Sequence, residues 1–448
     1  MGLLLTVTLA YGGAALALFR PFYGLLVYVC FAIVRPEDMW PWSVQDGNYS
    51  RIIAVSMLIG WVWRTLPKTI ARRRGSAEGL WVVGLFVGYW LWAGFLALSA
   101  DNAEVAWEHV EALSKILLPL IVGITTIDSV KKLKGLAWTI VVSQGYVAFE
   151  MNRYYFSGYN KLRIDGFGTL DNNCAVIGMV TVIGLAAFMF LNARKYWQKA
   201  IILACSAFMA HAVLFSFSRG GMLGLIVCAG VGFVLLKKSL KHYVAFAIAC
   251  GMVISATGPE VRARFLRTFE HQADGRREAS AQSRLDLWED CWVVFQRDPL
   301  MGCGPNHWPL LAHTFGWERG KEAHSLWIQT ATETGLPGIA MFAGFYVVCM
   351  LRLFLLMRRS DEDDDPWFSD SAKMVIAALA GFGVSAQFVS LELLEVPYYV
   401  CLLGAATLSV YARERRLVAQ ADECEDGYES EWDDKYADGY DWAASPAV

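Results

Sequence analysis

Long runs of apolar residues recur along the whole chain and are separated by short polar segments. Each run approaches the roughly 20 residues that a helix needs to cross a hydrocarbon core about 30 Å thick. A lone segment satisfies its own backbone hydrogen bonds in lipid only as a helix. The pattern therefore predicts an all-α, polytopic membrane protein with about 12–13 transmembrane helices, near residues 2–19, 22–34, 52–66, 80–99, 116–127, 136–149, 174–192, 200–217, 222–236, 243–257, 333–357, 374–390 and 396–411.

The basic residues fall on one side of the membrane when these spans alternate. The loops on the opposite side are poorer in Lys and Arg. Because cytoplasmic loops carry the excess of Lys and Arg, we predict that Met1 and residues 258–332 lie outside and that the C-terminus is cytoplasmic. The basic clusters are Lys68–Arg74, Lys131–Lys134, Arg194-Lys195, Lys237-Lys238, Arg358-Arg359 and Arg413–Arg416.

The chain divides into a membrane domain and an acidic tail. We assign residues 1–417 to the transmembrane domain, with 258–332 as one large exterior loop carrying interfacial helices, and residues 418–448 to a cytoplasmic tail. The stretch Asp422–Asp441 has too little aliphatic content to pack, so we expect it to be disordered. Its tyrosines and tryptophans leave a partner-binding role open.

Composition excludes some classes of function. The net charge of −3 implies no nucleic-acid partner. Most of the cysteines lie within or beside apolar runs, where cysteine acts as a small hydrophobic residue. With no CxxC pair and no Cys/His cluster at zinc spacing, the chain offers no metal site of that kind. Cys291 and Cys303 share the exterior loop, so a disulfide between them stays open.

Two arginines flank the predicted exterior surface near the seventh to ninth spans. Arg219 stands in Ser218-Arg219-Gly220-Gly221, which joins two spans with almost no loop. A guanidinium beside a glycine-rich helix start suits a phosphate group, although an arginine that only snorkels to the surface is the alternative. Arg163 either binds an anionic ligand or pairs with Asp165 or a lipid headgroup.

The long exterior loop contains an amphipathic helix. Asp298-Pro299 ends it, and a glycine-rich turn follows. We interpret it as an interfacial helix with its tryptophans at headgroup depth. The residues that share its apolar face are Leu287, Trp288, Cys291, Trp292 and Phe295.

His324 opens the next helix of the exterior loop. Nearby arginines favour the neutral imidazole, which is the form that accepts a proton. We therefore expect Arg219 and Arg284 to hold a diphosphate while His324 takes a proton from a hydroxyl group. A purely structural histidine is the alternative, and the rival histidines of the loop are His271, His307 and His313.

The order of these motifs resembles the bacterial O-antigen ligase and O-antigen polymerase superfamily over about residues 150–360. The opening Phe19–Gly24 resembles the O-glycosylation ligase branch associated with exosortase systems. The motifs in chain order are Arg163…Gly166…Asn172, Ser218-Arg219-Gly220, Ser283-Arg284…Trp288, Asp298-Pro299-Leu300-Met301-Gly302-Cys303-Gly304 and His324…Gln329…Glu333-Thr334-Gly335-Leu336-Pro337-Gly338.

The resemblance implies a GT-C-like glycosyltransferase of polysaccharide and lipopolysaccharide biosynthesis. Such an enzyme moves a glycan from a polyprenyl-diphosphate carrier, such as undecaprenyl diphosphate, to an acceptor hydroxyl on a glycan, lipid or protein. It acts without a metal or other cofactor at the periplasmic face of the bacterial inner membrane, among the membrane lipids. We expect a single displacement with inversion at the anomeric carbon.

The resemblance also implies roles for individual residues. His324, Arg284 and Arg219 match the catalytic positions, and Arg219, Arg284 and Arg163 would contact the donor diphosphate, Arg163 as an accessory contact. Ser325 follows His324 where the ligases usually have asparagine, which leaves the acceptor open.

Other functions stay possible on the sequence. An O-antigen-type polymerase of the same superfamily would use the same donor chemistry. A polytopic polysaccharide or lipid transporter would need ionisable residues at mid-membrane, and His211 in the eighth span is the residue to consider there, with packing or a hydrogen bond as its expected role. A scaffold that docks through the acidic tail is a third reading.

Overall fold

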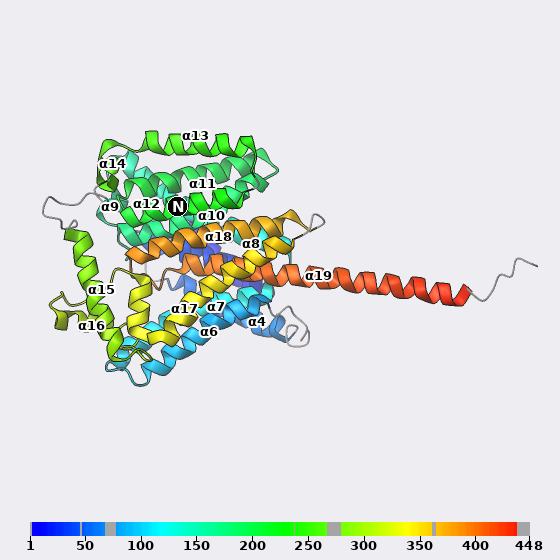
Figure 1. The fold of residues 1–448 in the computed structure, drawn as a ribbon, viewed down its shortest axis with the longest axis horizontal. Coiled ribbons are helices and arrows are strands. Elements are labelled where there is room, and N and C mark those ends of the chain that lie inside the picture. The colour runs from blue at the N-terminus through cyan, green and yellow to red at the C-terminus, as the bar shows by residue number, and fades with distance from the viewer. Residues whose placement is uncertain are drawn as a thin grey trace, which may run out of the picture.

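The computed structural model describes residues 2–44, 47–67, 78–236, 238–266, 279–360 and 364–436. Long helices lie side by side in a bundle (Figure 1), and each predicted span falls on one of them. These helices are α1 (Gly2–Phe19), α2 (Pro21–Val34), α4 (Tyr49–Arg64), α6 (Glu78–Ala97), α7 (Ala103–Thr126), α8 (Val130–Phe156), α10 (Asn172–Asn192), α11 (Tyr196–Phe215), α12 (Arg219–Leu235), α13 (Leu240–Ala256), α17 (Leu326–Arg359), α18 (Pro366–Ser385) and α19 (Glu395–Tyr436).

Within the described ranges, seven helices are long and apolar enough to cross a membrane: α1, α6, α7, α10, α11, α17, and α18 with the 3-10 turn η2 (Ala386–Phe388) that follows it. The prediction of an all-α, polytopic membrane protein is thereby confirmed. A total of 12–13 spans stays a prediction.

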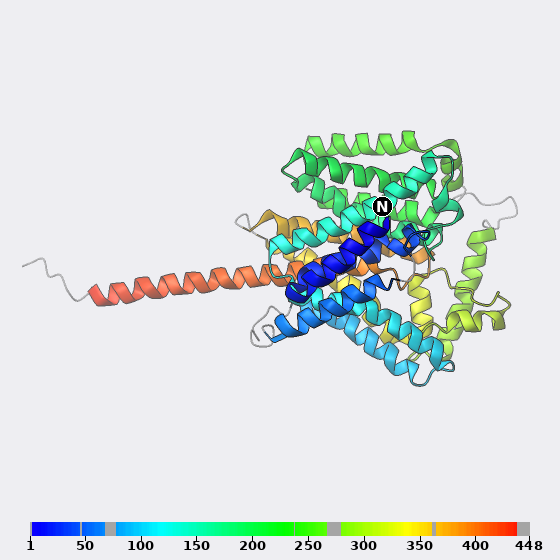
Figure 2. The same ribbon diagram turned by 180° about the vertical axis from the view of Figure 1, so that it is seen from behind.

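Short helices occupy one end of the bundle. Helix α15 (Ala279–Arg297) lies across the ends of the long helices, whereas α19 leaves the bundle at the opposite end (Figures 1 and 2). The described parts of the predicted exterior loop, 258–266 and 279–332, therefore form a layer at this end, which we call the exterior layer after that prediction. The remaining short elements are α3 (Pro36–Met39), α9 (Lys161–Ile164), α14 (Pro259–Leu266), α16 (Trp308–Leu311) and η1 (Ala312–Phe315).

The first part of α19 is the centre of the bundle. Nearly every residue from Val396 to Val410 is buried, against α6, α7, α8, α10, α17 and α18. Tyr398 and Tyr399 are among the largest fully buried side chains. An apolar run surrounded on all sides by other helices needs no polar face, which explains why the run shows no amphipathic pattern.

The same helix differs from the sequence prediction further along. We expected a disordered tail from residue 418, but α19 continues as one helix to Tyr436 and projects away from the bundle (Figure 1). The residues that follow the buried part, Ala412–Ala421, are rich in Ala, Arg, Glu and Leu, which are strong helix formers. Local propensity therefore favours continuing the helix beyond its buried part. Residues 437–448 lie outside the described residues.

Basic residues gather at the end of the bundle from which α19 leaves. The Lys134 ammonium lies 5.1 Å from the centre of the Trp367 ring at the start of α18, and Arg415 pairs with Asp364 at 3.3 Å. The predicted clusters of α8 and α19 thus share one end, away from α15. The clusters at residues 68–74 and at Lys237 lie outside the described residues, and the orientation in a membrane stays a prediction.

A kink in α17 joins the exterior layer to the bundle. Gly335 is non-helical, with φ 65° and ψ −171°. The carbonyl groups of Thr332 and Glu333 are thereby free to accept hydrogen bonds from the N–H groups of Cys303 and Gly304, at 3.0 and 2.9 Å. The backbone geometry at Gly335 is open essentially to glycine alone.

We expect Gly335→Ala to destabilise the fold. The strained backbone alone costs about 1–3 kcal/mol for any other residue. The added Cβ would also lie 2.2 Å from the carbonyl oxygen of Leu300, a contact that must shift the turn. Thermal unfolding of purified protein should therefore show a lower midpoint. The matched control is Gly344→Ala in the same helix, whose Cβ would meet only side-chain atoms of Leu85 at 3.7 Å or more; an equal loss in both variants would contradict this account.

Candidate active site

Arg219 is the first residue of α12. The positive end of that helix faces the exterior layer. The Ser218 side chain caps the helix by accepting a hydrogen bond from the Gly221 N–H at 3.2 Å. Gly220 packs closely on Phe388, since a Cβ there would lie 2.9 Å from the Phe388 Cβ. A helix N-terminus that begins with a guanidinium favours negative charge.

Arg284 lies on α15 and faces the same place. Its guanidinium sits 6.0 Å from the centre of the Phe388 ring. Burial and then the charge of Arg219 lower the pKa of Arg284, while Asp171 opposes the shift. The two guanidinium groups are therefore close enough to repel each other, and a bound anion would relieve that repulsion.

Asp171 supplies the negative charge beside the two arginines. It caps α10 by accepting a hydrogen bond from the Cys174 N–H at 2.7 Å. Burial raises the pKa of Asp171, but hydrogen bonds from Cys174 and Asn173 outweigh burial and hold the pKa below its usual value. The carboxylate is thus ionised at neutral pH.

His324 completes the cluster. Its backbone is left-handed, with φ 50°, and it comes just before Ser325, which caps α17. Burial, Arg284 and Lys321 lower the pKa of His324, and Asp171 opposes them. The imidazole is therefore held in the neutral form, which accepts a proton. We call Arg219, Arg284, His324 and Asp171 the charged cluster.

The structure thus brings three of the predicted site residues together from three different helix ends. Arg219 comes from α12, Arg284 from α15, and His324 from the start of α17. Their roles in catalysis stay predictions. Chemically, two guanidinium groups can hold a diphosphate by charge-assisted hydrogen bonds, and a neutral imidazole next to them can take a proton from a hydroxyl group.

Arg163 stands apart from these charges. Its guanidinium lies over the ring of Phe217, 4.3 Å from the centre. Asp165, which we considered as its ion-pair partner, accepts a hydrogen bond from the Tyr159 hydroxyl at 2.8 Å instead. Since Phe217 comes two residues before Arg219, Arg163 is placed beside the start of α12, and its accessory role with the donor stays a prediction.

The rival histidines have other surroundings. His307 is buried, and its Nε2 accepts a hydrogen bond from the Asn102 N–H at 3.0 Å while Nδ1 donates to the Pro305 carbonyl at 2.8 Å. Both ring nitrogens are thus occupied by backbone groups, which indicates a structural role. The exposed His313 bonds the Leu310 carbonyl, and His271 lies outside the described residues.

His211 is packed rather than charged. Its ring lies in α11 between Tyr155 and Phe156 of α8 and stacks on Phe215, with ring centres 4.3 Å apart. The packing role that we expected for His211 is confirmed.

The interpretation of α15 needs a correction. Leu287, Cys291 and Val294 form its buried stripe and pack with Trp308 and Ala323 of the same loop, so this face builds a small core rather than a membrane contact. Trp288 is half-buried, while Trp292 is exposed and stacks on Phe295. The prediction included Trp292 in the apolar face and left out Val294. It did not consider other residues of the loop as packing partners of this helix.

Cysteines and acidic residues do not build a metal site in the described part of the chain. Cys291 and Cys303 are both free, so the disulfide that we left open is not formed. Within the same ranges no three His, Cys, Asp or Glu side chains gather closely enough to hold a metal ion. A reaction without metal stays a prediction.

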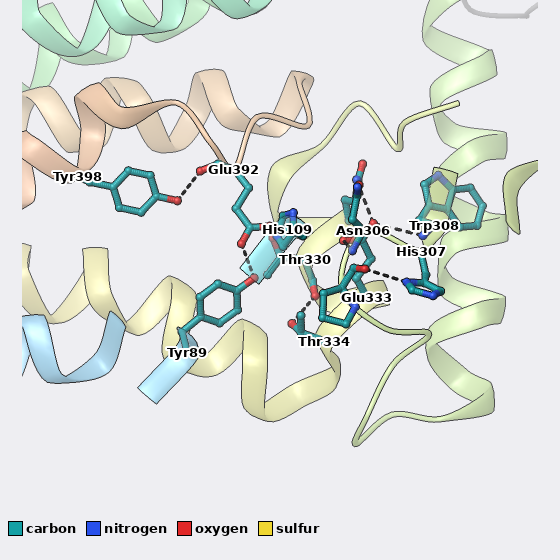
Figure 3. Close-up of polar contacts among 12 residues, drawn as sticks. Tyr89, His109, Asn306, His307, Trp308, Thr330, Glu333, Thr334, Glu392 and Tyr398 are labelled. Carbon is teal, nitrogen blue, oxygen red and sulfur yellow. Dashed lines mark hydrogen bonds and ion pairs between the residues drawn. The ribbon is translucent and has the colours of Figure 1, made fainter. Parts of the chain in front are cut away.

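A buried polar network lies under the exterior layer and was missed by sequence reasoning (Figure 3). The Glu392 carboxylate accepts a hydrogen bond from the Tyr89 hydroxyl and pairs with His109 Nε2 at 3.4 Å. Charges that are buried this way need partners from other elements, here α6 and α7. Because Glu392 lies in the segment that follows η2, these contacts hold that segment in place. Phe388, whose ring Arg284 contacts, is the last residue of η2.

A small cavity is lined in part by residues that precede Asp171 in the chain. Phe167 and Leu170, from the loop that ends in Asp171, line it together with Arg35, Gln144 and Glu395. Neither arginine of the cluster nor His324 borders it, so we do not assign the donor to this cavity.

Comparison with known proteins places these residues in a known sequence context. A search of the curated proteins found no match. The family model described as a family of unknown function (DUF5935) matches residues 1–161. The family model described as O-antigen ligase matches residues 204–343, a segment that contains Arg219, Arg284 and His324. Residues 204–343 are thus similar to the O-antigen ligase family, while the exosortase-associated branch stays a prediction.

Proposed function

We propose that the protein is a metal-independent, inverting glycosyltransferase of the O-antigen ligase type, which moves a glycan from a polyprenyl-diphosphate carrier to an acceptor hydroxyl. The observation that carries the proposal is the convergence of Arg219, Arg284 and His324 at one end of a membrane bundle. The match to the O-antigen ligase family over these same residues supports it.

The two arginines suit a diphosphate leaving group. When the bond between the anomeric carbon and the diphosphate oxygen breaks, the electron pair and a negative charge remain on the diphosphate. Two guanidinium groups that are held in place stabilise that charge without a metal ion. The start of α12 adds its positive dipole at the same point.

His324 suits the acceptor side of the same step. Its neutral imidazole takes the proton of the acceptor hydroxyl while that oxygen bonds to the anomeric carbon. Attack from the side opposite the leaving diphosphate inverts the configuration at that carbon. The products are the glycosylated acceptor and the carrier diphosphate, and the proton rests on His324 until solvent removes it.

The arrangement of charges supports a reaction on the periplasmic side of the membrane. The charged cluster lies at the end of the bundle that carries α15, opposite the basic residues and the projecting part of α19 (Figure 1). If the basic end is cytoplasmic, the cluster faces the periplasm.

A transport assay separates this proposal from its rival in another class. Purified protein in sealed vesicles receives a polyprenyl-diphosphate glycan with a labelled sugar. Our account predicts a covalent bond between the label and an added acceptor. Movement of the intact donor across the bilayer without any covalent product would favour a lipid or polysaccharide transporter. A polymerase of the same superfamily would transfer the label to a second carrier-linked glycan.

We expect transfer to persist at acidic pH. The base must be neutral, and the pKa of His324 is lowered by burial, by Arg284 and by Lys321. Activity should therefore stay high below the usual histidine pKa of about 6.5 and fall only as the pH passes through the lowered value. A pH–rate profile of kcat/KM measures this acidic limb. Lys321→Met should move the limb to higher pH, and an unchanged or opposite shift would contradict this role for His324.

A further inference from the structure

The backbone of Ala323, the residue before His324, is held from both sides by side chains of the exterior layer. The Ala323 N–H donates to Gln329 Oε1 at 3.0 Å, and the Ala323 carbonyl accepts from Trp288 Nε1 at 2.9 Å. Ala323 itself is completely buried. Both backbone hydrogen-bonding groups of Ala323 are thus satisfied by side chains rather than by a helix or by water.

We call these two hydrogen bonds to Ala323 the clamp. One of them comes from Trp288 on α15, the helix that also carries Arg284. Trp288 follows Arg284 by four residues on α15, so the two side chains lie one helical turn apart on one face. Leu287 and Cys291, on the neighbouring face, pack with Ala323 in one small apolar core. A shift of α15 would therefore move Arg284 and the Ala323 peptide together.

Gln329 is itself oriented by a buried carboxylate. Its Nε2 donates to Glu333 Oε1 at 3.1 Å, which leaves Oε1 facing the Ala323 N–H. Glu333 is buried and also accepts from the backbone N–H groups of Asn306 and Trp308, at 2.9 and 3.3 Å (Figure 3). The carboxylate is thus fixed by three donors, and the amide of Gln329 has one orientation that satisfies both of its ends.

His324 needs such support because of its backbone. A residue other than glycine in the left-handed region is strained and persists only where its surroundings determine it. The hydrogen bonds to Ala323 before it and the helix cap at Ser325 after it hold His324 in this conformation. Without the two hydrogen bonds to Ala323, the His324 backbone would relax. Its imidazole would then move away from the charges of Arg284 and Lys321.

We propose that Trp288 and Gln329 are positioning residues, which set the imidazole of His324 against Arg284 by clamping the Ala323 peptide, with Glu333 as the residue that orients Gln329. The catalytic half of this inference rests on the proposed function, since it concerns the base of that reaction. Its geometric half, that the clamp sets the environment of His324, stands independently of any activity.

The test uses Trp288→Phe, which keeps an aromatic side chain and removes the indole N–H together with part of the ring system; the Trp317→Phe control carries the same loss of ring. The matched control is Trp317→Phe, which borders the same small apolar core but whose Nε1 donates to Asp290 of α15 at 2.8 Å rather than to the Ala323 carbonyl. Gln329→Met is the second variant; it removes the bond to Ala323, while Glu333 keeps its two backbone donors. Full-length protein with an unchanged unfolding midpoint is used for each.

The first readout needs no substrate. Deuterium exchange at the imidazole C2–H, followed by mass spectrometry of the peptide that carries His324, gives the pKa of this histidine. The charges that act on it come from Arg284 of α15, from Lys321 in its own loop and from Asp171 at the start of α10. We expect Trp288→Phe and Gln329→Met to raise the His324 pKa toward its usual value and Trp317→Phe to leave it unchanged.

The second readout is glycan transfer. Trp288→Phe should lower kcat by about tenfold to a hundredfold, as a misplacement on the order of 1 Å does, with the KM for the donor unchanged. Folded Trp288→Phe and Gln329→Met proteins whose His324 pKa equals that of wild type would overturn the clamp. A raised pKa together with no transfer by wild type would instead keep the clamp and refute the proposed function.

Discussion

Replacing His324 with alanine is expected to reduce glycan transfer by about a hundredfold to ten-thousandfold, the usual contribution of a positioned acid or base. The loss should appear in kcat, because the arginines that hold the donor remain in place. Transfer is measured with purified protein and a polyprenyl-diphosphate glycan. Added imidazole should restore part of the rate, since a small base can enter the space left by the side chain.

Two further variants make the result specific to His324. His324→Asn keeps a residue that adopts left-handed backbone readily, so a loss in this variant is not a folding defect. His313→Ala removes an exposed histidine of the same loop whose ring bonds only the Leu310 carbonyl in the described structure, and it should leave the rate unchanged. Full activity in folded His324→Ala would exclude this residue as the base.

The second large effect is expected at Arg284. Replacing it with methionine should lower kcat by about a hundredfold to a thousandfold, the usual cost of losing one group that stabilises a developing anion. Arg284→Lys should recover only part of the rate, because lysine keeps the charge but loses the bidentate fork. The rate at which the carrier diphosphate is released measures the effect of each substitution, Arg284→Met and Arg284→Lys.

Arg297→Met is the matched control for this prediction. Arg297 lies on the same helix, and its guanidinium also lies over an aromatic ring, that of Phe315, at 5.6 Å. The charged cluster does not include it, so transfer should be unaffected. Equal losses in Arg284→Met and Arg297→Met would show that α15 needs positive charge in general rather than a guanidinium at the cluster.

The fold was predictable where one physical effect dominates. Long apolar runs must form helices in a membrane, and each predicted span fell on a helix. For residues 418–436 we expected disorder from their inability to pack, whereas the structure continues α19 through them. A helix that starts in a buried core needs no further packing to continue through strong helix formers such as those of Ala412–Ala421.

The charged cluster was predictable in part. Arg219, Arg284 and His324 stand in recognisable motifs beside apolar runs, which is how sequence reasoning found them. The roles of Asp171, Phe388, and the pair of His109 and Glu392 depend on segments far apart in the chain. No local pattern marks a residue whose partner lies on another helix, so these contacts required the structure.

The exterior loop shows the same limit. Trp288 looked like an interfacial anchor because a tryptophan on an apolar helix face often is one. Its indole N–H instead holds the Ala323 carbonyl, 35 residues further along the chain. Gln329 and Glu333 were visible only as parts of a motif, and their function as a support for the Ala323 peptide follows from three-dimensional contacts.

The most direct measurement of the central claim is the yield and anomeric configuration of the product that purified wild-type protein forms in excess EDTA. The donor is a polyprenyl-diphosphate glycan of known configuration, and NMR of the new linkage gives the configuration after one transfer. Our account predicts full transfer in the chelator with an inverted linkage. A retained linkage, a requirement for added divalent metal, or no transfer by folded protein to any acceptor would contradict it.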